Sequence, residues 1–383
     1  MIDSKESLMQ LNVERFYKYL DGFKAYLEAM SEEPLIDLTT DKFFATQEGY
    51  KHGVYHNAQN ILDFNNWSIS DIGSGKIFKK AIQAVDEGAN LVHHQQKLHF
   101  KNKVYEKPKQ AEQLLYNIYC GYNDAKAFDD AVGFWGGKYD LLAYLFFIKD
   151  STKYLPISSS NFDERFKLLG ISLKTNRSCS SSNYFAFVGC INELRKQMEK
   201  YYGFYISLLD AHSIIWQLNA ANEFVARMEE KYADVNLSQE VGKYLAQKGF
   251  KSNGYSGKPK EQEQPICTSG HNVYPRNRLV ALNALYIAKN TCEINPDHES
   301  FIRKNADVKY MEPHHLVPMA FSHKFKVSLD IEENIICLCS NCHNEIHYGK
   351  QAKELVEQLY FKRKDLLKNV GIDISLKELL EMY

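Results

Sequence analysis

The sequence predicts an α+β protein, in which a large mixed α/β N-terminal domain precedes a small metal-stabilised domain and C-terminal helices. Three observations lead to this prediction. Long stretches place apolar residues at helical spacing, other apolar runs are as short as strands, and five of the eight cysteines fall in the last third of the 383 residues. An apolar content of 44% with 25% charged residues is ordinary for a globular protein, and the length allows two or three domains.

The first 250 residues are predicted to form the mixed N-terminal domain. The segment 154–157 (YLPI) has the length and apolar character of a strand, and turn residues follow it. No nucleotide, phosphate-loop or metal signature occurs in this part of the sequence. Helical spacing of apolar residues predicts helices at 1–30, 77–94 and 184–201, and a further apolar element at 204–218.

A polar segment separates this region from the rest of the chain. Residues 251–265 (KSNGYSGKPKEQEQP) contain mainly Gly, Pro, Ser, Lys, Glu and Gln with one aromatic residue, so they cannot bury much surface. We therefore predict a solvated linker between the N-terminal domain at 1–250 and a second domain at 266–350. A helical extension is predicted at 351–383.

The residues suited to chemistry are concentrated in the stretch EPHHLVPMAFSHKFKVSLDIEENIICLCSNCHNEIHYG, which begins at Glu312. His343 and His347 are four residues apart, so on a helix both imidazoles leave the same face and can chelate one ion. His314 and His315 are neighbours in a predicted strand, and consecutive strand residues point to opposite faces. One of them can therefore join this ion, while the other stays beside it as a general base, because imidazole needs little pKa tuning at physiological pH.

This stretch resembles the HNH endonuclease family, and in particular its bacterial restriction-type members with the pattern HHxxP…N…CxxCHxxIH. The resemblance implies a ββα-metal module, in which two strands and a helix surround one ion. It implies that His314 is the strand metal ligand, that His315 is the general base, and that the amide of Asn334 braces the loop between the strands. The resemblance also implies that His343 and His347 are the metal ligands on the helix.

The pair Cys339 and Cys342 belongs to a second site. Many HNH proteins hold their small module together with a structural zinc ion, so two further ligands are expected upstream. Cys292 and His298 are the best candidates, because they complete a closed tetrahedral set of three thiolates and one imidazole. Other family members often use a second Cys-x-x-Cys there, whereas here five residues separate the Cys from the His. The substitutes for His298 that the sequence leaves open are Cys267 and Cys337.

The resemblance implies hydrolysis of DNA phosphodiester bonds with one catalytic divalent metal ion, giving 5′-phosphate and 3′-hydroxyl ends. An all-imidazole ligand set suits Mn, Ni, Co or Zn, and Mg is a further candidate. The net charge is −1, so a DNA-binding surface must be a local patch. The candidate phosphate contacts are Arg276 and Arg278, which fit a solvated helix start equally well, together with Arg303, Lys304 and Lys309.

Two interpretations of the whole chain follow from these features. The first is a restriction or anti-phage defence endonuclease whose N-terminal domain recognises DNA, and the chain resembles stand-alone bacterial HNH endonucleases with a large N-terminal region. The second is a regulated effector, or a non-cleaving zinc-stapled DNA-binding protein, whose N-terminal domain senses a ligand or a partner. A double-strand cut needs two active sites or two events, and a homodimer would supply the former.

The sequence also predicts where the protein acts. MIDSKESLMQ has no basic segment followed by an apolar one, and no apolar run approaches the ~20 residues needed to span a bilayer. We therefore expect a cytoplasmic protein that does not contact a membrane.

Two other groups of residues have the composition of a catalytic or metal site but are not predicted to form one. Asp210, His212 and Ser213 spell an acid–His–Ser series in LLDAHSIIW, yet sequence neighbours rarely form a triad and no Gly-x-Ser-x-Gly elbow is present. A helix is predicted there instead. His93 and His94 lack a matched set of partner ligands and are interpreted as ordinary polar residues.

Overall fold

The computed structural model describes residues 11–245, 251–268, 271–304 and 306–383. It divides the chain into two compact units, Met1–Ala221 and Asn222–Tyr383. The boundary lies inside helix α12 (Leu208–Leu245) and not at the predicted position after residue 250. The reason is that the second part of α12 carries apolar residues, among them Leu237 and Val241, that are buried in the core of the second unit.

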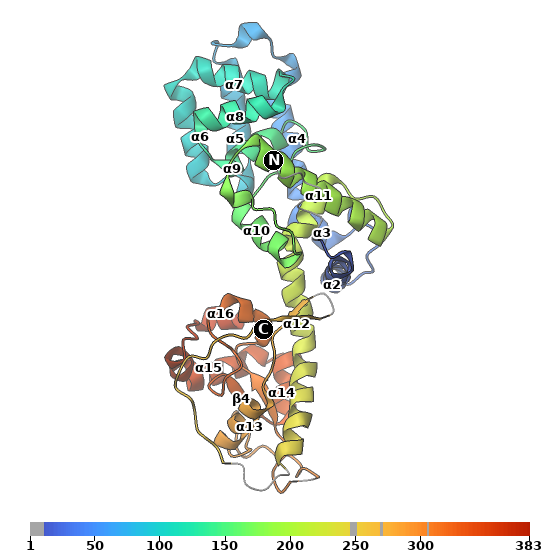
Figure 1. Cartoon of the computed structure of the whole chain (residues 1–383), viewed down its shortest axis with the longest axis vertical. Helices are drawn as coiled ribbons and strands as arrows, with labels where there is room; N and C mark the ends of the chain where they lie inside the picture. The colour runs from blue at the N-terminus through green and yellow to red at the C-terminus, as the bar shows by residue number, and fades with distance from the viewer. Residues whose placement is uncertain (1–10, 246–250, 269–270, 305) are drawn as a thin grey trace. The chain divides into compact units, whose positions relative to one another are not determined.

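The first unit is helical over its described residues. Glu112 illustrates how its helices are held, because this fully buried carboxylate accepts hydrogen bonds from the backbone N–H groups of Ile77 (2.9 Å) and Phe78 (3.2 Å) at the start of α5. Its helices (Figure 1) are α2 (Val13–Ser31), α3 (Lys42–Glu48), α4 (Tyr50–Leu62), α5 (Lys76–Asp86), α6 (His94–Glu106), α7 (Pro108–Cys120), α8 (Asp124–Trp135), α9 (Tyr139–Phe147), α10 (Ser159–Leu168), α11 (Ser181–Tyr202) and the first part of α12.

The predicted mixed character of this unit is wrong, because no strand occurs between residues 11 and 221 of the described chain. The segment 154–157 is irregular and largely buried. Tyr184 takes the place of a neighbouring strand: its hydroxyl accepts from the Leu155 N–H at 3.1 Å and donates to the Leu155 carbonyl at 2.7 Å. A side chain therefore satisfies the backbone groups that would otherwise require strand pairing.

The predicted helices of the first unit are found with shifted ends. The helix predicted at 184–201 is α11, and the one predicted at 1–30 is α2, with residues 1–10 outside the described part. The helix predicted at 77–94 stops early, at Asp86, because Ala89 adopts a left-handed backbone conformation before α6 begins at His94.

The second unit contains helices and two small two-stranded sheets. Strand β3 pairs antiparallel with β4, and helix α14 begins two residues after β4 ends. The sequence therefore folds locally as two strands followed by a helix, the order the motif predicts. The elements after α12 (Figure 1) are β1 (Ile266–Thr268), β2 (His271–Val273), α13 (Arg278–Ile287), β3 (Glu312–His315), the 3-10 helix η5 (Met319–Lys324), β4 (Ile335–Leu338), α14 (Ser340–Tyr348), α15 (Ala352–Asn369) and α16 (Leu376–Leu380).

The segment 251–265 is irregular and mostly exposed, but it does not separate two domains. It is attached to the second unit, since the Gly257 N–H donates to Glu333 Oε1 at 2.7 Å and the Ser328 N–H donates to the Lys260 carbonyl at 2.9 Å. Because the end of α12 already belongs to the second unit, this segment runs along that unit. None of the helices in the described parts of the chain is long and apolar enough to cross a membrane.

Candidate metal centre

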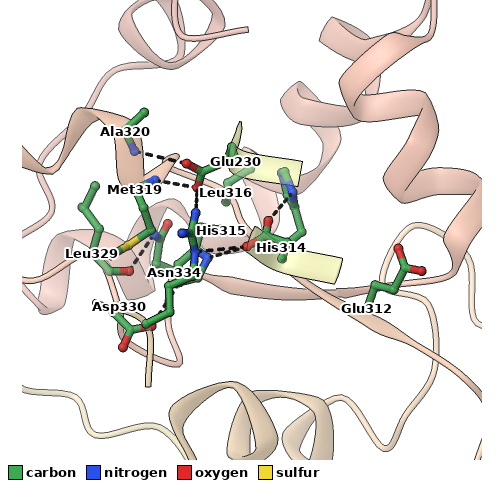
Figure 2. Close-up of polar contacts among 12 residues, drawn as sticks. Glu230, Glu312, His314, His315, Leu316, Met319, Ala320, Leu329, Asp330 and Asn334 are labelled. Atoms are coloured by element: carbon green, nitrogen blue, oxygen red, sulfur yellow. Dashed lines mark hydrogen bonds and ion pairs between the residues drawn. The ribbon is translucent and has the colours of Figure 1, made fainter. Parts of the chain in front are cut away.

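Strands β3 and β4 position the double histidine. In their antiparallel pairing, His314 lies opposite Ile336 and His315 opposite Ile335. Every residue of β3 is buried, so both imidazoles are held in the interior. Successive strand residues point in different directions. His314 lies against the two histidine rings of α14. His315 instead reaches Asp330 in the loop before β4, as Figure 2 shows.

Three imidazoles and one carboxylate converge in this unit. They are His314 of β3, His343 and His347 of α14, and Asp234 of α12, whose candidate ligand atoms lie within 4.8 Å of one another. His343 Nε2 is 3.2 Å from His347 Nε2, and Asp234 Oδ2 is 3.6 Å from His314 Nδ1 and 3.7 Å from His343 Nε2. Ligands about 2.0–2.1 Å from one tetrahedral ion lie about 3.3–3.4 Å apart. The four groups therefore fit a single divalent ion.

Two neighbouring side chains fix which ring nitrogen faces this cluster. His343 Nδ1 lies 2.5 Å from Glu312 Oε2, so its N–H donates to the carboxylate and Nε2 is the nitrogen that faces the other ligands. His314 Nε2 lies 2.8 Å from the hydroxyl of Tyr383, which itself donates to the Leu316 carbonyl at 2.8 Å. The hydroxyl thus accepts from His314, whose Nδ1 keeps its lone pair. Such partners are typical of metal-binding histidines.

Asp234 also contacts the predicted general base. Its Oδ1 lies 3.3 Å from His315 Nδ1, and Asp330 Oδ1 lies 3.1 Å from His315 Nε2. Burial lowers the pKa of His315, but the two carboxylates outweigh it and raise this pKa to about 9. Burial raises the pKa of Asp234, yet the surrounding imidazoles hold it well below its usual value. His315 is thus held between two carboxylates in this structure, and its role as a general base stays a prediction.

Asn334 braces the loop between β3 and β4. Its side chain is fully buried and makes three hydrogen bonds to the backbone. Its Oδ1 accepts from the Val317 N–H at 2.8 Å, and its Nδ2 donates to the carbonyls of Val317 and Leu329, both at 2.9 Å. Because Val317 follows His315 by two residues, this amide fixes the chain immediately after the double histidine (Figure 2).

Arg276 is enclosed by acidic residues. Its Nη2 lies 2.8 Å from Glu230 Oε1 and its Nε lies 3.4 Å from Asp234 Oδ1, and only 10% of its side chain is exposed. Glu230 also accepts from the N–H groups of Met319 (2.9 Å) and Ala320 (3.3 Å), as Figure 2 shows. The structure thus corrects the prediction for Arg276: it neutralises buried carboxylates and is not on the surface, where a phosphate contact would need it.

The other basic candidates differ in how open they are to solvent. Arg278 is exposed at the start of α13, with its guanidinium 4.9 Å from the ring centre of Tyr244, and Lys304 is exposed as well. Arg303 and Lys309 are half-buried and donate to backbone carbonyls at 2.7 Å and 3.3 Å. Arg278 and Lys304 are therefore the predicted phosphate contacts that the structure leaves available.

A second cluster contains the four predicted zinc ligands. The side chains of Cys292, His298, Cys339 and Cys342 place their candidate ligand atoms within 4.8 Å of one another. His298 Nδ1 lies 3.6 Å from Cys339 Sγ and 3.2 Å from Cys342 Sγ. Three sulfurs and one imidazole at this spacing fit a tetrahedral structural zinc ion. The cluster includes His298, the ligand for which the sequence left substitutes open.

The cysteines of the cluster differ in their surroundings, and burial raises the pKa of Cys342. Burial raises the pKa of Cys292, but backbone amides of Cys339, Asn295 and Ile294 outweigh it and lower this pKa to about 7. Cys337 instead lies in the core of β4, where burial raises the pKa of its thiol well above the usual value. It is not among the clustered ligands. The side chain of Cys267, the other substitute, lies outside the described residues.

The comparisons with known proteins concern a third of the chain. Over 132 residues it is 33% identical to the type IV methyl-directed restriction enzyme EcoKMcrA of Escherichia coli (strain K12), and the match covers 34% of this chain and 42% of that relative. The chain therefore spans less than half the length of this relative. No family model matches the chain. No solved structure matches it.

The structure adds five residues that the sequence interpretation missed. Glu312 and Asp330 lie within the motif stretch itself, so acidic residues beside the motif histidines were an available signal. Glu230 and Asp234 are four residues apart on α12. Acidic residues at this spacing are also common on solvent-exposed helix faces, so the spacing alone does not indicate a site. Tyr383 makes its contact with His314 only through the tertiary fold.

Proposed function

We propose that this chain is a metal-dependent endonuclease of the restriction type that hydrolyses DNA phosphodiester bonds. The observation that carries the proposal is the convergence of three imidazoles and a carboxylate beside buried His315, with neighbouring ligand atoms 3.2–3.7 Å apart. The similarity to a methyl-directed restriction enzyme supports DNA as the substrate. The cysteine-rich cluster would hold a structural zinc ion, separate from the catalytic one.

Each residue of the proposed site would have a separate role. When bound, a divalent ion at His314, His343 and His347 would neutralise charge on the scissile phosphate and the departing 3′-oxygen. His315 would accept a proton from the attacking water, which requires that its ring be neutral and that its unprotonated nitrogen be released from its carboxylate partner. Asn334 would keep the backbone after His315 in place. The expected ends are a 5′-phosphate and a 3′-hydroxyl.

Asp234 favours a second candidate function, a nuclease whose activity is regulated. One of its oxygens faces His314 and His343 and the other faces His315. A scissile phosphate must make these same two contacts, so the carboxylate occupies the position that substrate needs. On this account α12 holds the site closed until the N-terminal unit binds its target or partner.

The Asp234→Asn variant separates a blocking carboxylate from a constitutive fourth ligand. The amide keeps the shape of the side chain and removes its charge. If the carboxylate blocks the site, cutting accelerates while manganese affinity changes little; if it is a required ligand, manganese affinity and cutting fall together. Manganese affinity is measured by calorimetry and cutting on supercoiled plasmid.

The proposed activity is tested with purified protein and Mg or Mn on unmodified, methylated and hydroxymethylated DNA. Discrete, site-dependent fragments support a restriction-type enzyme. Cutting that appears only with an added factor supports the regulated form, and absence of cutting under every condition contradicts both. Sedimentation with and without DNA tests whether a homodimer supplies two active sites.

A further inference from the structure

A cavity of about 310 Å³ lies within the first unit. It is formed by the end of α3, the start of α4, the segment before α10, and the first turns of α12. Its volume is at the lower end of the range for small-molecule sites, about 300–1,000 Å³. The side chains that matter for its chemistry are Glu48, Lys51, Phe162, His212 and Trp216.

One wall of the cavity carries a buried ion pair. Lys51 is 3% exposed and pairs with Glu48, and it also donates to the hydroxyl of Ser213 at 3.0 Å. Glu48 accepts a further hydrogen bond from Gln217 Nε2 at 2.9 Å. Burial lowers the pKa of Lys51 despite the attraction of Glu48. A buried pair of this kind contributes little net stability, so its presence beside a cavity points to a role in binding.

His212, which also interacts with the backbone of Pro156, has one ring nitrogen that lacks a partner. Its side chain is 3% exposed, and Nδ1 has no hydrogen-bond partner among the described residues. Burial lowers the pKa of this histidine well below its usual value, so the ring is neutral. A buried polar atom without a partner is costly, and a bound ligand that completes the hydrogen bond removes that cost.

Aromatic rings form much of the remaining surface around these groups. The ring centre of Phe162 lies 4.8 Å from that of His212 and 6.0 Å from that of Trp216. Lys51 Nζ lies 6.0 Å from the Trp216 ring centre. The cavity thus combines ring faces with a cationic donor and an unpartnered imidazole nitrogen. A small, flat, heteroaromatic ligand with hydrogen-bonding groups on its edge matches this combination.

We propose that this cavity binds a single nucleobase, stacked on its aromatic wall and hydrogen-bonded at its edge by Lys51 and His212. The proposal rests on the proposed function, because a nuclease that selects its DNA must read bases. An adjoining polar cavity of about 470 Å³ shares Ile157 and Ser158 with the first and includes the hydroxyls of Ser159 and Ser160. A sugar attached to the base would lie there.

The experiment uses the intact chain in metal-chelating buffer, so that no cutting occurs. Trp216 lines the cavity, and its fluorescence reports occupancy. The protein is titrated with 2′-deoxycytidine, 5-methyl-2′-deoxycytidine, thymidine and 2′-deoxyadenosine, and separately with a DNA duplex that carries one unpaired base. We expect saturable quenching by at least one nucleoside or by the duplex, and no quenching when Trp216→Phe is titrated.

The His212→Phe variant tests the polar contact while preserving an aromatic ring in a buried position. Loss of one hydrogen bond in the cavity predicts about five- to tenfold weaker binding. His56→Phe is the matched control, because His56 is exposed on α4 and does not line the cavity, and its binding should be unchanged. Circular dichroism establishes that both variants are folded.

The outcomes separate this inference from the proposed nuclease activity. Quenching by the duplex but not by free nucleosides indicates a base extruded from DNA, and the reverse indicates a free nucleoside as ligand; both support a nucleobase site. If neither quenches, or if folded His212→Phe binds as well as wild type, the nucleobase site is wrong even when the protein cuts DNA. Base binding without any cutting would instead overturn the proposed function alone.

Discussion

Replacing Asn334 by alanine should destabilise the second unit more than any other single amide substitution in the motif stretch. Its side chain makes three hydrogen bonds to the backbone and is fully buried. Each bond contributes about 1 kcal/mol net, and the partners left behind are buried as well. We therefore expect Asn334→Ala to lower the free energy of unfolding of this unit by about 3–5 kcal/mol, a large part of the total for a domain.

The two units can be followed separately in one urea titration. All three tryptophans, Trp67, Trp135 and Trp216, lie in the first unit, so their fluorescence reports that unit alone. Release of zinc to a chromogenic chelator reports the second unit. The prediction is that zinc release shifts to lower urea in Asn334→Ala while the tryptophan transition does not move.

A matched substitution controls for the loss of an amide side chain. Asn344 is exposed on α14, and Asn344→Ala should change the free energy of unfolding by no more than about 0.5 kcal/mol. If Asn334→Ala shifts zinc release by no more than this control, Asn334 does not brace the loop and the reasoning fails.

Three further predictions test the metal sites and the DNA surface. Cys342→Ser should reduce bound zinc, measured by atomic absorption, to well below half an ion per chain; full zinc occupancy would show that the ion lies elsewhere. Glu312→Gln should weaken manganese binding by about 10–100-fold in calorimetry, because His343 loses the charged acceptor that orients it. Unchanged manganese affinity would show that Glu312 does not support the metal site. Arg278→Ala should weaken DNA binding similarly for all sequences and reduce the slope of log affinity against log salt concentration by about 1. Arg276→Ala should instead lower the free energy of unfolding by about 3–5 kcal/mol, because two buried carboxylates lose their cation. Loss of stability in Arg278→Ala with none in Arg276→Ala would contradict these placements.

The parts of the site that the sequence predicts are those determined by local geometry. The i, i+4 spacing of His343 and His347 on α14 brings both imidazoles to one face of that helix. Adjacent positions on β3 send His314 and His315 to different neighbours. The four zinc ligands, including His298, converge as expected. The first two cases follow from secondary structure alone, whereas His298 meets Cys339 across 41 residues of sequence and was placed by the ligand set that a zinc ion requires.

The parts that were missed depend on contacts between distant segments. Asp234 precedes His315 by 81 residues and reaches the site only because the end of α12 packs into the second unit. That packing also explains why the predicted boundary after residue 250 was wrong. Arg276 was predicted at the surface, since the sequence does not reveal the two carboxylates that enclose it. The predicted strand at 154–157 has no pairing strand, and the hydroxyl of Tyr184 satisfies the N–H and carbonyl of Leu155 instead.

The most direct test of the nuclease proposal compares His315→Ala with His323→Ala on the DNA that the wild-type protein cuts. His315 is buried beside the metal centre, whereas His323 is exposed eight residues later and pairs with Glu223 at 3.1 Å. The cleavage rate with Mn should fall by at least about 100-fold in His315→Ala, the usual contribution of a general base, and remain near wild type in His323→Ala. Both proteins should keep a full zinc ion. Cleavage at the wild-type rate by zinc-loaded His315→Ala would contradict the account.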